Sequence, residues 1–369
     1  MCAPFRFVVK TCLGGRQIFQ TLILGEMPNE RLIFRLWLIL RALPKLLLAR
    51  SYIAGADVVI ARNFDLLALA WITRQKSTPL IYECLDIHSV MTGGKWINRI
   101  VRLAERFVLR RIQLLWTSSP GLMTHYFEDV QDYRGSVALV ENKLWFGTST
   151  PARPTINDRP KGNGCIVLGW VGTIRCKASF DLLCGVAQRM PDSLKIEVHG
   201  VVHSHAIPDF DARLGSLSNV TFHGPYVYPE GLAEVYHRCD LVWAQDLWQR
   251  GGNSDWLLPN RIYEASWYGC PSIAVARTET GNRVRSDGLG PVIYLATIKH
   301  LQNCLQDLSR TKLRTLSESI LRMEDTKFRL TEDDIEKALS PVLIQSNSIS
   351  DDKGRGLGHL ANTDPAPKA

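Results

Sequence analysis

The sequence predicts an α/β protein of two doubly wound, Rossmann-like domains that face each other across a cleft. Its 369 residues exceed the size at which a single hydrophobic core stops growing. Short apolar segments of strand character alternate with helical segments along most of the chain. Residues 148–164, rich in Thr, Pro, Gly and Asn, separate this alternation into two cycles, as a linker between domains does.

The first domain is assigned to residues 1–147. An apolar segment with regularly placed basic residues, 31–50, is expected to form a helix at a protein or membrane surface, kinked or divided at Pro44. Buried strands are expected after it at residues 57–61, 79–84, 113–117 and 137–140. The helices that alternate with these strands are expected at residues 64–74, 94–111 and 120–127.

The second domain is assigned to residues 165–330. Its strands are expected at residues 165–171, 195–199, 220–222, 241–244, 272–276 and 292–294, and its helices at 179–189, 229–239, 259–268 and 298–308. A terminal helix is expected at 331–345, and the polar, Gly- and Pro-containing residues 346–369 are expected to be disordered. Two such domains in tandem bind ligands between the carboxyl ends of their sheets.

Composition limits the classes of function. A net charge of +8 indicates an anionic partner: nucleic acid, a phosphate-bearing substrate or a membrane surface. Nine scattered cysteines without a C-x-x-C pair argue against a disulfide framework and a structural zinc site, and favour a reducing compartment. No secretory signal or spanning apolar segment is evident, which predicts a cytoplasmic protein, soluble or peripheral to a membrane.

The first candidate site follows the first strand of the second domain. Gly172 would let the backbone approach a ligand closely, and the N-terminus of the helix that follows would offer N–H groups to an anion. Arg175 and Lys177 could add positive charge against a diphosphate. A strand-to-helix turn with a glycine and two surface bases is also commonplace.

The densest candidate segment spans residues 250–271. Four residues could expose successive backbone N–H groups to an anion: Gly251, Gly252, Asn253 and Ser254. Pro259 suits the first position of a helix whose positive end would point at this loop. Glu264 lies three residues after Arg261 and could accept two hydrogen bonds from a ribose diol; alternatively it is a surface residue paired with Arg261.

These motifs together resemble the donor-binding domain of family 4 GT-B glycosyltransferases. The resemblance rests on the strand-Gly-x-x-x-x-Lys-x-x-x-Asp-Leu-Leu run at 166–183, N-V-T-F-H-G at 219–224, the helix and strand at 232–244, and P-N-R-I-Y-E at 259–264. In the first domain, A-R-N at 61–63, Y-E-C-L-D-I-H at 82–88 and V-E-N-K at 140–143 are similar to transferases that assemble bacterial exopolysaccharides of the succinoglycan type. The resemblance covers roughly residues 55–295.

The resemblance implies roles for these residues. Glu264 would bind the ribose of a UDP-type donor, Arg175 and Lys177 would neutralise the diphosphate, and the 251–254 loop would face the donor sugar. Asn260 and Arg261 would complete the donor site, and Asp86 and His88 would lie on the acceptor side of the cleft as candidate catalytic residues. No cofactor and no metal are expected, since helix dipole and basic side chains would stabilise the leaving diphosphate.

The sequence departs from the family pattern in three places. Many members carry a second Glu eight residues before the ribose-binding one, where Trp256 stands here, beside Asp255. Thr173 occupies a position that is often Arg. Family members usually open with a strand, a glycine-containing loop and a helix; residues 1–30 do not show this pattern, so the acceptor domain is expected to be shortened at its start.

Histidines offer further candidates. His88, in an Asp-x-His sequence at a strand end, could contact the donor sugar or act as a base near neutral pH, or it could make a purely structural hydrogen bond. His199 and His223 also end predicted strands and are expected to face the same cleft.

A second basic element lies in the predicted 94–111 helix. Arg99, Arg102, Arg106 and Arg110 are expected to share one face of this helix, as either a solvated charge stripe or a surface for anionic lipid head groups. With the 31–50 segment, this face predicts peripheral binding at the inner face of the plasma membrane.

The predicted activity is transfer of a hexose, with glucose the first candidate, from a UDP-sugar to a lipid-linked oligosaccharide in exopolysaccharide biosynthesis. The alternatives are a GT-B sugar epimerase or a transferase with a soluble acceptor, a non-catalytic or inactive homologue in polysaccharide assembly, and a nucleic-acid-binding protein. The last has no recognised nucleic-acid-reading motif.

Overall fold

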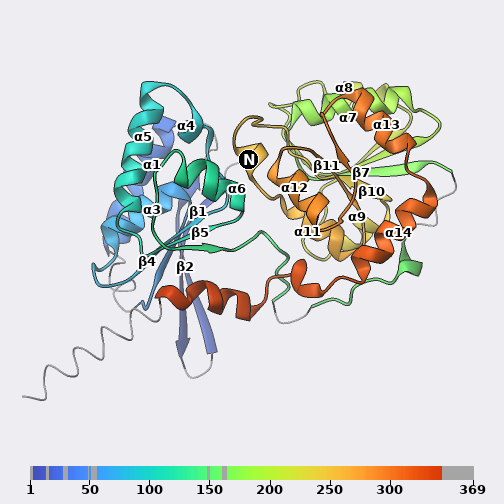
Figure 1. The fold of residues 1–369 in the computed structure, drawn as a ribbon. Helices are drawn as coiled ribbons and strands as arrows, with labels where there is room; N and C mark the ends of the chain where they lie inside the picture. Colours follow the sequence, from blue (N-terminus) through green and yellow to red (C-terminus); the bar gives the residue numbers. More distant parts are fainter. Residues whose placement is uncertain are drawn as a thin grey trace, which may run out of the picture.

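Two domains of parallel strands flanked by helices lie side by side in the computed structural model (Figure 1). The structure describes residues 3–13, 16–27, 32–48, 50, 56–147, 150–159 and 164–342. This architecture confirms the predicted pair of doubly wound domains. The predicted tail at 346–369 and parts of the predicted linker lie outside the described residues.

The N-terminal domain holds a four-stranded parallel sheet in the order β3-β4-β5-β6. All four strands fall where the apolar segments predict them: β3 (Val59–Arg62), β4 (Leu80–Cys84), β5 (Leu114–Thr117) and β6 (Val137–Leu139). β5 is buried along its whole length, as expected for an apolar strand covered on both faces.

Helices connect these strands. The predicted ones are present as α1 (Leu32–Leu48), α3 (Asn63–Thr73), α5 (Trp96–Leu109) and α6 (Pro120–Leu122), which continues as the π-helix η1 (Met123–Glu128). A short helix, α4 (Ser89–Thr92), precedes α5 and was not predicted. α1 runs through Pro44, so the expected division there is wrong.

The start of the chain pairs β1 (Ala3–Leu13) with β2 (Arg16–Met27) as an antiparallel hairpin. The sequence analysis did not anticipate this hairpin, although Gly14-Gly15 between two apolar runs is a sequence signal for one. The hairpin forms a sheet of its own, separate from the parallel sheet.

The C-terminal domain holds a six-stranded parallel sheet in the order β12-β11-β10-β7-β8-β9. Every predicted strand is present, as β7 (Ile166–Ile174), β8 (Leu194–Val202), β9 (Val220–Gly224), β10 (Leu241–Trp243), β11 (Ser272–Val275) and β12 (Val292–Ile293). β7 and β8 are longer than predicted, and they pair from Ile166 and Leu194 to Ile174 and Val202.

The predicted helices of this domain are α7 (Lys177–Arg189), α9 (Leu232–His237), α11 (Asn260–Trp267) and α13 (Ile298–Gln306). Sequence analysis missed α8 (Phe210–Gly215), α10 (Asn253–Trp256), α12 (Glu279–Ser286) and α14 (Arg310–Leu321), besides the single 3-10 turns η2 (Ile156–Asp158) and η3 (Asp325–Lys327).

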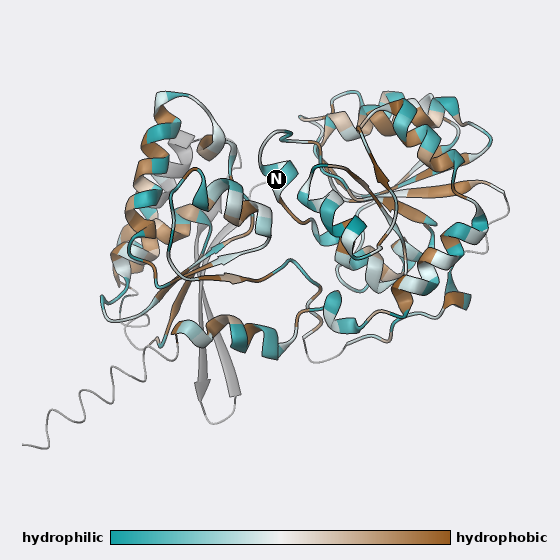
Figure 2. Cartoon of the chain, in the orientation of Figure 1, coloured by the Kyte–Doolittle hydropathy of each residue, from teal (hydrophilic) through white to brown (hydrophobic). Residues whose placement is uncertain are grey.

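Strands of this sheet are coloured as hydrophobic in Figure 2. Their apolar side chains pack on both faces of the sheet. One core joins the sheet to α7 and α13 through residues such as Phe180 and Leu301, and the other joins it to α9 and α11 through Tyr236 and Ile262. Helices on both faces leave the carboxyl ends of the strands as the edge available to ligands.

Residues 332–342 form a helix that returns to the N-terminal domain (Figure 1). Ala338 and Val342 pack against Ile81 and Leu114, and Trp116 Nε1 donates a hydrogen bond to the Ala338 carbonyl at 3.2 Å. The chain therefore crosses between the domains twice, once before β7 and once before this helix.

Candidate active site

A cavity of about 460 Å³ lies between the two domains, at the carboxyl ends of their sheets. We call it the donor cavity. The N-terminal domain contributes Leu85, Asp86 and Asn142. The C-terminal domain lines the rest with the end of β7, the segment after β10 and the start of α11. The predicted cleft is therefore present, and both domains form it.

Glycines let the backbone of β7 and β8 come close together beside this cavity. Gly172 and Gly200 pair across the two strands with φ of +111° and +140°. A Cβ on Gly200 would lie 1.7 Å from the Gly172 carbonyl oxygen, which no side chain could tolerate. Gly172 itself lines the donor cavity, as predicted for close approach of a ligand.

Two guanidinium groups line the donor cavity next to Gly172. The Arg261 side chain donates from Nη1 to the Trp243 carbonyl at 3.2 Å. The Arg175 guanidinium lies over the Trp248 ring, 5.9 Å from the ring centroid. Both charges are held by neighbouring groups of the same domain, a suitable arrangement for an anionic ligand.

Glu264 is the buried carboxylate of the donor cavity, with 6% of its surface exposed. Its Oε2 accepts a hydrogen bond from the Tyr236 hydroxyl at 2.7 Å. Burial raises the pKa of Glu264, while the Tyr236 hydrogen bond and the charge of Arg261 act in the opposite direction. A carboxylate can accept further hydrogen bonds after this one, so Glu264 can accept hydrogen bonds from a ligand in the cavity. It is not a surface residue paired with Arg261, which was the alternative interpretation of the sequence.

The N-terminus of α11 opens onto the donor cavity. Pro259 is the N-cap residue and Asn260 the first helical residue, one position later than predicted. Both line the cavity, so the positive end of the helix dipole points into it.

Lys177 is not among the residues that line the donor cavity. It is the first residue of α7, and its ammonium lies 2.8 Å from an Asp181 oxygen and 3.6 Å from an Asp209 oxygen. These carboxylates hold the side chain away from the cavity. The prediction that Lys177 faces the diphosphate is therefore not met in this structure.

Residues 251–254 do not form the predicted open anion site, because the segment forms a turn and the first residues of α10 and makes its own hydrogen bonds. The Gly251 N–H donates to Asp255 Oδ2 at 2.7 Å, and Ser254 Oγ accepts from the Gln249 N–H at 2.7 Å. Asn253 Oδ1 accepts from the Ile87 N–H of the other domain at 2.8 Å. None of Gly251, Gly252, Asn253 and Ser254 is among the donor cavity's lining residues.

Asp86 and His88 separate in the structure. Asp86 lines the donor cavity from the N-terminal domain. His88 is the N-cap of α4, where its Nδ1 accepts from the Val90 N–H at 3.3 Å, and it is not a lining residue. His199 and His223 are not lining residues either, which makes the expectation that they face this cleft wrong.

Comparison with known proteins identifies the family to which the chain belongs. Residues 26–142 match the Glycosyl transferase 4-like domain family. Succinoglycan biosynthesis protein ExoL of Rhizobium meliloti (strain 1021) is 32% identical over 307 residues, which cover 81% of this chain and 75% of ExoL. The chain belongs to the family 4 GT-B glycosyltransferases of exopolysaccharide biosynthesis.

Solved structures agree with this family at the level of the fold. The crystal structure of Anabaena HepE in complex with UDP has a TM-score of 0.57 at 15% identity and covers 88% of this chain and 85% of HepE. Sucrose-phosphate synthase from Thermosynechococcus elongatus has a TM-score of 0.61 at 15% identity and covers 86% and 79%.

This family 4 glycosyltransferase has further donor-cavity residues that sequence reasoning missed: Tyr226, Tyr228, Gln245 and Asp246. They follow β9 and β10, so their place at strand carboxyl ends was the available signal. Burial raises the pKa of Tyr228 to about 12 and raises that of Tyr226 as well, so both hydroxyls are neutral hydrogen-bonding groups. Gln245 Oε1 accepts from the Thr278 hydroxyl at 3.0 Å, which fixes its amide.

A second cavity of about 660 Å³ lies between α4, α5 and η1 of the glycosyltransferase and the 251–256 segment of the other domain. We call it the arginine cavity, since Arg99, Arg102 and Arg106 line it. Arg102 Nη1 donates to the Met91 and Gly93 carbonyls at 2.9 and 2.8 Å.

Arg99, Arg102 and Arg106 share one face of α5, as predicted, but this face lines the arginine cavity, and another part of the helix exposes an apolar stripe. Arg106 Nη2 donates to the Val130 carbonyl at 2.6 Å, so Arg102 and Arg106 turn inward. Four apolar side chains are instead exposed at helical spacing, namely Trp96, Ile100, Leu103 and Phe107. We call this set the α5 stripe.

Trp256, which stands where many family members have a carboxylate, joins the two domains. Its ring stacks on the His125 ring with centroids 5.8 Å apart, and its carbonyl accepts a hydrogen bond from Ser119 Oγ at 2.5 Å. Arg283 of α12 also binds Glu141 across the interface, with Nη1 3.1 Å from Oε2. Trp256 lines the arginine cavity and does not line the donor cavity.

Proposed function

We propose that the enzyme transfers a hexose, with glucose the first candidate, from a UDP-sugar to a lipid-linked oligosaccharide. The observation that carries this proposal is the buried Glu264 carboxylate beside the α11 N-terminus and two guanidinium groups in one interdomain cavity. HepE, which shares the fold, has been crystallised with UDP, with UDP and glucose, and with UDP-glucose.

In this proposal Glu264 accepts hydrogen bonds from the ribose hydroxyls, while Tyr236 orients the carboxylate from behind. Arg175 and Arg261 bind the diphosphate together with the N–H groups of the α11 N-terminus. Tyr226 and Tyr228 offer aromatic surface to the base from the segment after β9.

Transfer forms a bond between an acceptor hydroxyl oxygen and the anomeric carbon, and breaks the bond from that carbon to the β-phosphate oxygen. Negative charge develops on the departing UDP, and Arg175, Arg261 and the helix N-terminus stabilise it without a metal ion or other cofactor. Asp86, the carboxylate that the N-terminal domain contributes to the cavity, takes the acceptor proton. His88 stays a predicted catalytic residue that also caps α4.

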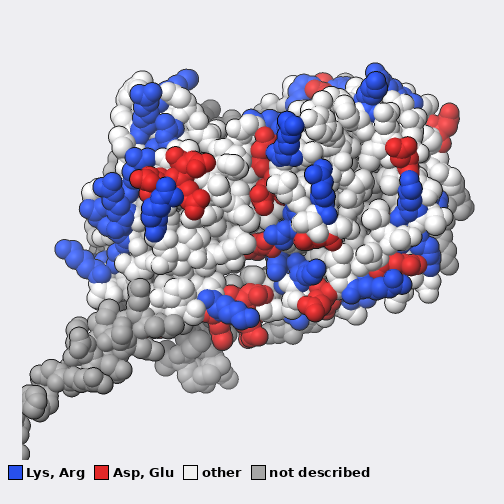
Figure 3. Space-filling view, in the orientation of Figure 1, with Lys and Arg blue, Asp and Glu red and all other residues white. Residues whose placement is uncertain are grey.

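The arginine cavity is the proposed site for the acceptor. Its three arginines suit the diphosphate of a lipid-linked oligosaccharide, and Gly251 and Trp256 close the cavity from the donor-binding domain. Figure 3 shows basic side chains on the surface of both domains, with acidic side chains among those of the N-terminal domain. An acceptor held there would lie between the domain that binds the lipid and the domain that binds the donor.

The α5 stripe supports a peripheral position on the inner face of the plasma membrane. Trp96 is 73% exposed and Leu103 61% exposed, and side chains of this kind insert at the boundary between head groups and acyl chains. Among the helices that the structure describes, none combines the length and apolar content needed to cross a bilayer. Replacing Trp96 and Ile100 with Ser should release the protein from vesicles that contain anionic lipid, without lowering UDP affinity, since both side chains are exposed and neither lines the donor cavity or the arginine cavity.

The donor proposal is tested by thermal shift and calorimetry with UDP and a series of nucleotide sugars. A bound UDP-sugar should raise the Tm by mass action. Glu264→Gln, which keeps the shape and the Tyr236 contact, should weaken UDP binding at least about tenfold, because hydrogen bonds to a charged acceptor contribute about 1.5–3 kcal/mol. Glu234→Gln, on the exposed face of α9, is the matched control and should bind UDP normally.

Absence of a shift with every nucleotide sugar, or wild-type UDP affinity in Glu264→Gln, would contradict the proposal. The second candidate is a non-catalytic homologue in polysaccharide assembly, which the substitution of a carboxylate by Trp256 favours. Mass spectrometry of products from UDP-glucose and lipid-linked acceptors separates the two: UDP binding without a glycosylated product favours the non-catalytic role. An epimerised sugar nucleotide as the product would indicate an epimerase instead.

A further inference from the structure

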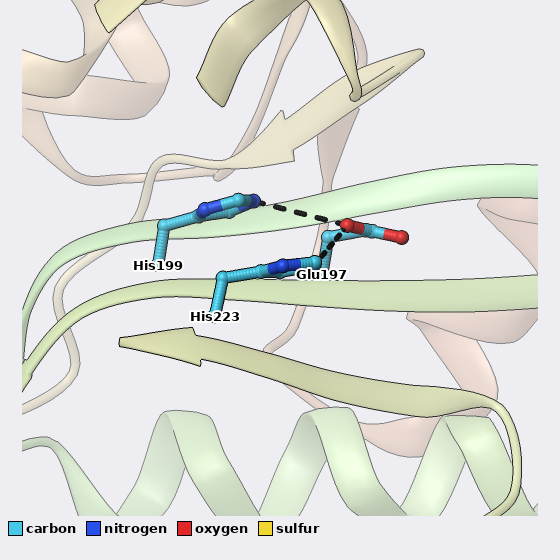
Figure 4. A group of neighbouring side chains, drawn as sticks. All are labelled: Glu197, His199 and His223. Atoms are coloured by element: carbon cyan, nitrogen blue, oxygen red, sulfur yellow. Dashed lines mark hydrogen bonds and ion pairs between the residues drawn. The ribbon is translucent and has the colours of Figure 1, made fainter. Parts of the chain in front are cut away.

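Three side chains with metal-binding atoms meet on neighbouring strands at the edge of the C-terminal sheet, outside both cavities (Figure 4). Glu197 and His199 are two residues apart on β8, so they lie on the same face of the sheet. A register shift between β8 and β9 at Val198 and His199 places His223 of β9 beside His199. The two imidazole rings stack with centroids 4.4 Å apart.

The potential ligand atoms converge on a small volume. Glu197 Oε2 lies 2.5 Å from His223 Nε2 and 3.8 Å from His199 Nε2. One ligand atom from each of the three residues lies within 4.8 Å of the other two, and no other such group of three occurs among the described residues. Figure 4 shows both rings directing an edge toward the Glu197 carboxylate.

His199 gives the strongest indication that this group binds a ligand. Its side chain is only 5% exposed, and its Nε2 has no hydrogen-bond partner among the described residues, since Glu197 is too distant at 3.8 Å. A buried polar atom without a partner costs about 1–3 kcal/mol, and native structures seldom keep one without a reason.

We propose that Glu197, His199 and His223 bind one divalent transition-metal ion of the Zn²⁺ class. Two imidazoles and one carboxylate form a set that Zn²⁺ accepts, with a fourth position left for water. His223 is exposed, so the ion has a path from solvent.

The surrounding charges and elements define the role of such an ion. Glu234 of α9 and Arg238 at the C-terminal end of α9 lie near His199 and form an ion pair with each other at 2.8 Å. Glu197 is therefore the carboxylate that would compensate the charge of the ion. The ion would tie the edge strand β9 to β8, just before the segment that carries Tyr226 and Tyr228 into the donor cavity. It would be structural and not catalytic, because none of the three ligands lines that cavity. Cysteine spacing could not reveal it, since no cysteine takes part.

The test titrates the full-length protein with Zn²⁺ after treatment with a chelator, using a chromophoric chelator as competitor, and repeats the titration with Co²⁺ to record its visible spectrum. We expect one equivalent bound and a higher Tm with Zn²⁺. His223→Ala and Glu197→Gln should each weaken Zn²⁺ binding at least about tenfold. His205→Ala, an exposed histidine elsewhere in the same domain, should leave it unchanged.

Far-UV circular dichroism and the thermal melt of the chelator-treated proteins serve as the folding check, so the outcome is independent of the proposed function. Both variants should keep the wild-type spectrum and a cooperative melt; if His223→Ala does not fold, Glu197→Gln decides the result. The proposal is overturned if no stoichiometric Zn²⁺ binding occurs, or if affinity is unchanged in the folded ligand variants. Loss of Zn²⁺ binding in His205→Ala would likewise overturn it.

Discussion

The donor cavity and the arginine cavity are built in different ways. The key side chains of the donor cavity are held by contacts within the C-terminal domain: Glu264 by the Tyr236 hydroxyl and Arg261 by the Trp243 carbonyl. The arginine cavity is closed only where the domains meet, by Gly251 and Trp256 against α4 and α5. Nucleotide binding should therefore survive changes at the interface that impair the acceptor reaction.

The interface beside the two cavities supports this difference, because polar contacts between loops and helix ends contribute to it, besides the stacking of Trp256 on His125. Ile87 with Asn253, Ser119 with Trp256 and Glu141 with Arg283 are such contacts. Interfaces of this kind permit relative motion of domains, and closure of a cleft around two substrates is a common catalytic step. Mutations that impair one cavity and spare the other would show that the two cavities act independently.

The largest effect is expected from Gly200→Ala, which would remove the rigid frame of the donor cavity. The added Cβ would meet the Gly172 carbonyl at 1.7 Å, at a φ of +140° that side chains rarely adopt. The backbone must shift, at a cost of about 3 kcal/mol or more. The change should appear as a large drop in Tm and loss of UDP binding by calorimetry.

Gly215→Ala is the matched control in the same domain, because a Cβ there would meet nothing within 4 Å at the end of α8. Its Tm should equal or slightly exceed that of wild type. Equal stability of Gly200→Ala and Gly215→Ala would show that the close approach of β7 and β8 is not required.

Arg283→Ala should weaken the contact between the domains and so impair the arginine cavity without affecting the donor cavity. It leaves the Glu141 side chain, 8% exposed, without its cationic partner, and should lower stability by about 2 kcal/mol. We expect kcat/KM for transfer to fall while UDP affinity stays within about twofold of wild type. Arg285→Ala, exposed on the same helix, should change neither quantity. Equal losses of UDP affinity and turnover in Arg283→Ala would argue against independent cavities.

Arg99→Ala probes the arginine cavity directly. Arg99 lines that cavity and is exposed, so its removal should not affect folding. Loss of one charge-assisted contact to a diphosphate should raise KM for a lipid-linked acceptor about tenfold, with unchanged affinity for UDP-glucose. Arg110→Ala, at the exposed end of α5, is the control and should leave the acceptor KM as it is. A rise in both variants would assign the effect to general surface charge.

The sequence was sufficient for both parallel sheets, because buried strands are short apolar runs whatever surrounds them. It was insufficient for α12 and α14, whose sequences are mostly polar and whose helical form depends on a few buried residues such as Val284 and Ile320. The hairpin of β1 and β2 does not follow the strand, loop and helix order typical of the family, so the family pattern gave no expectation of it.

Within the candidate site, residues at strand ends and helix starts were placed correctly from order alone, as Gly172, Arg261 and Glu264 show. Lys177 was not, because the carboxylates that hold it come from α7 and the segment before α8. The orientation of α5 could not be predicted either. Both a basic and an apolar face fit its sequence, and the carbonyls that bind Arg102 and Arg106 lie outside the helix.

The smallest expected effect concerns pH and distinguishes the Glu264 carboxylate from every group of the arginine cavity. Burial raises the pKa of Glu264 above the value of about 4.3 typical of an unfolded chain. The ionised form is the better acceptor for ribose hydroxyls, so affinity for UDP-glucose should fall as pH decreases through the raised pKa. UDP-glucose is the suitable probe because its diphosphate diester does not titrate in this range.

Stability of the unliganded protein should change in the opposite direction over the same interval. A carboxyl group whose pKa is higher in the folded state binds more protons there, so its contribution to the free energy of unfolding increases as pH falls from neutral toward about 4.3. Relative to Glu264→Gln, wild type should lose affinity for UDP-glucose as pH falls from neutral toward the unfolded-chain value of about 4.3, together with a gain in Tm. Calorimetry and thermal melts of the two proteins measure both. Parallel pH profiles for wild type and Glu264→Gln would show that Glu264 does not contact the donor. Opposite trends in affinity and Tm are expected from a buried carboxylate that contacts the donor and that destabilises the empty cavity when it is ionised.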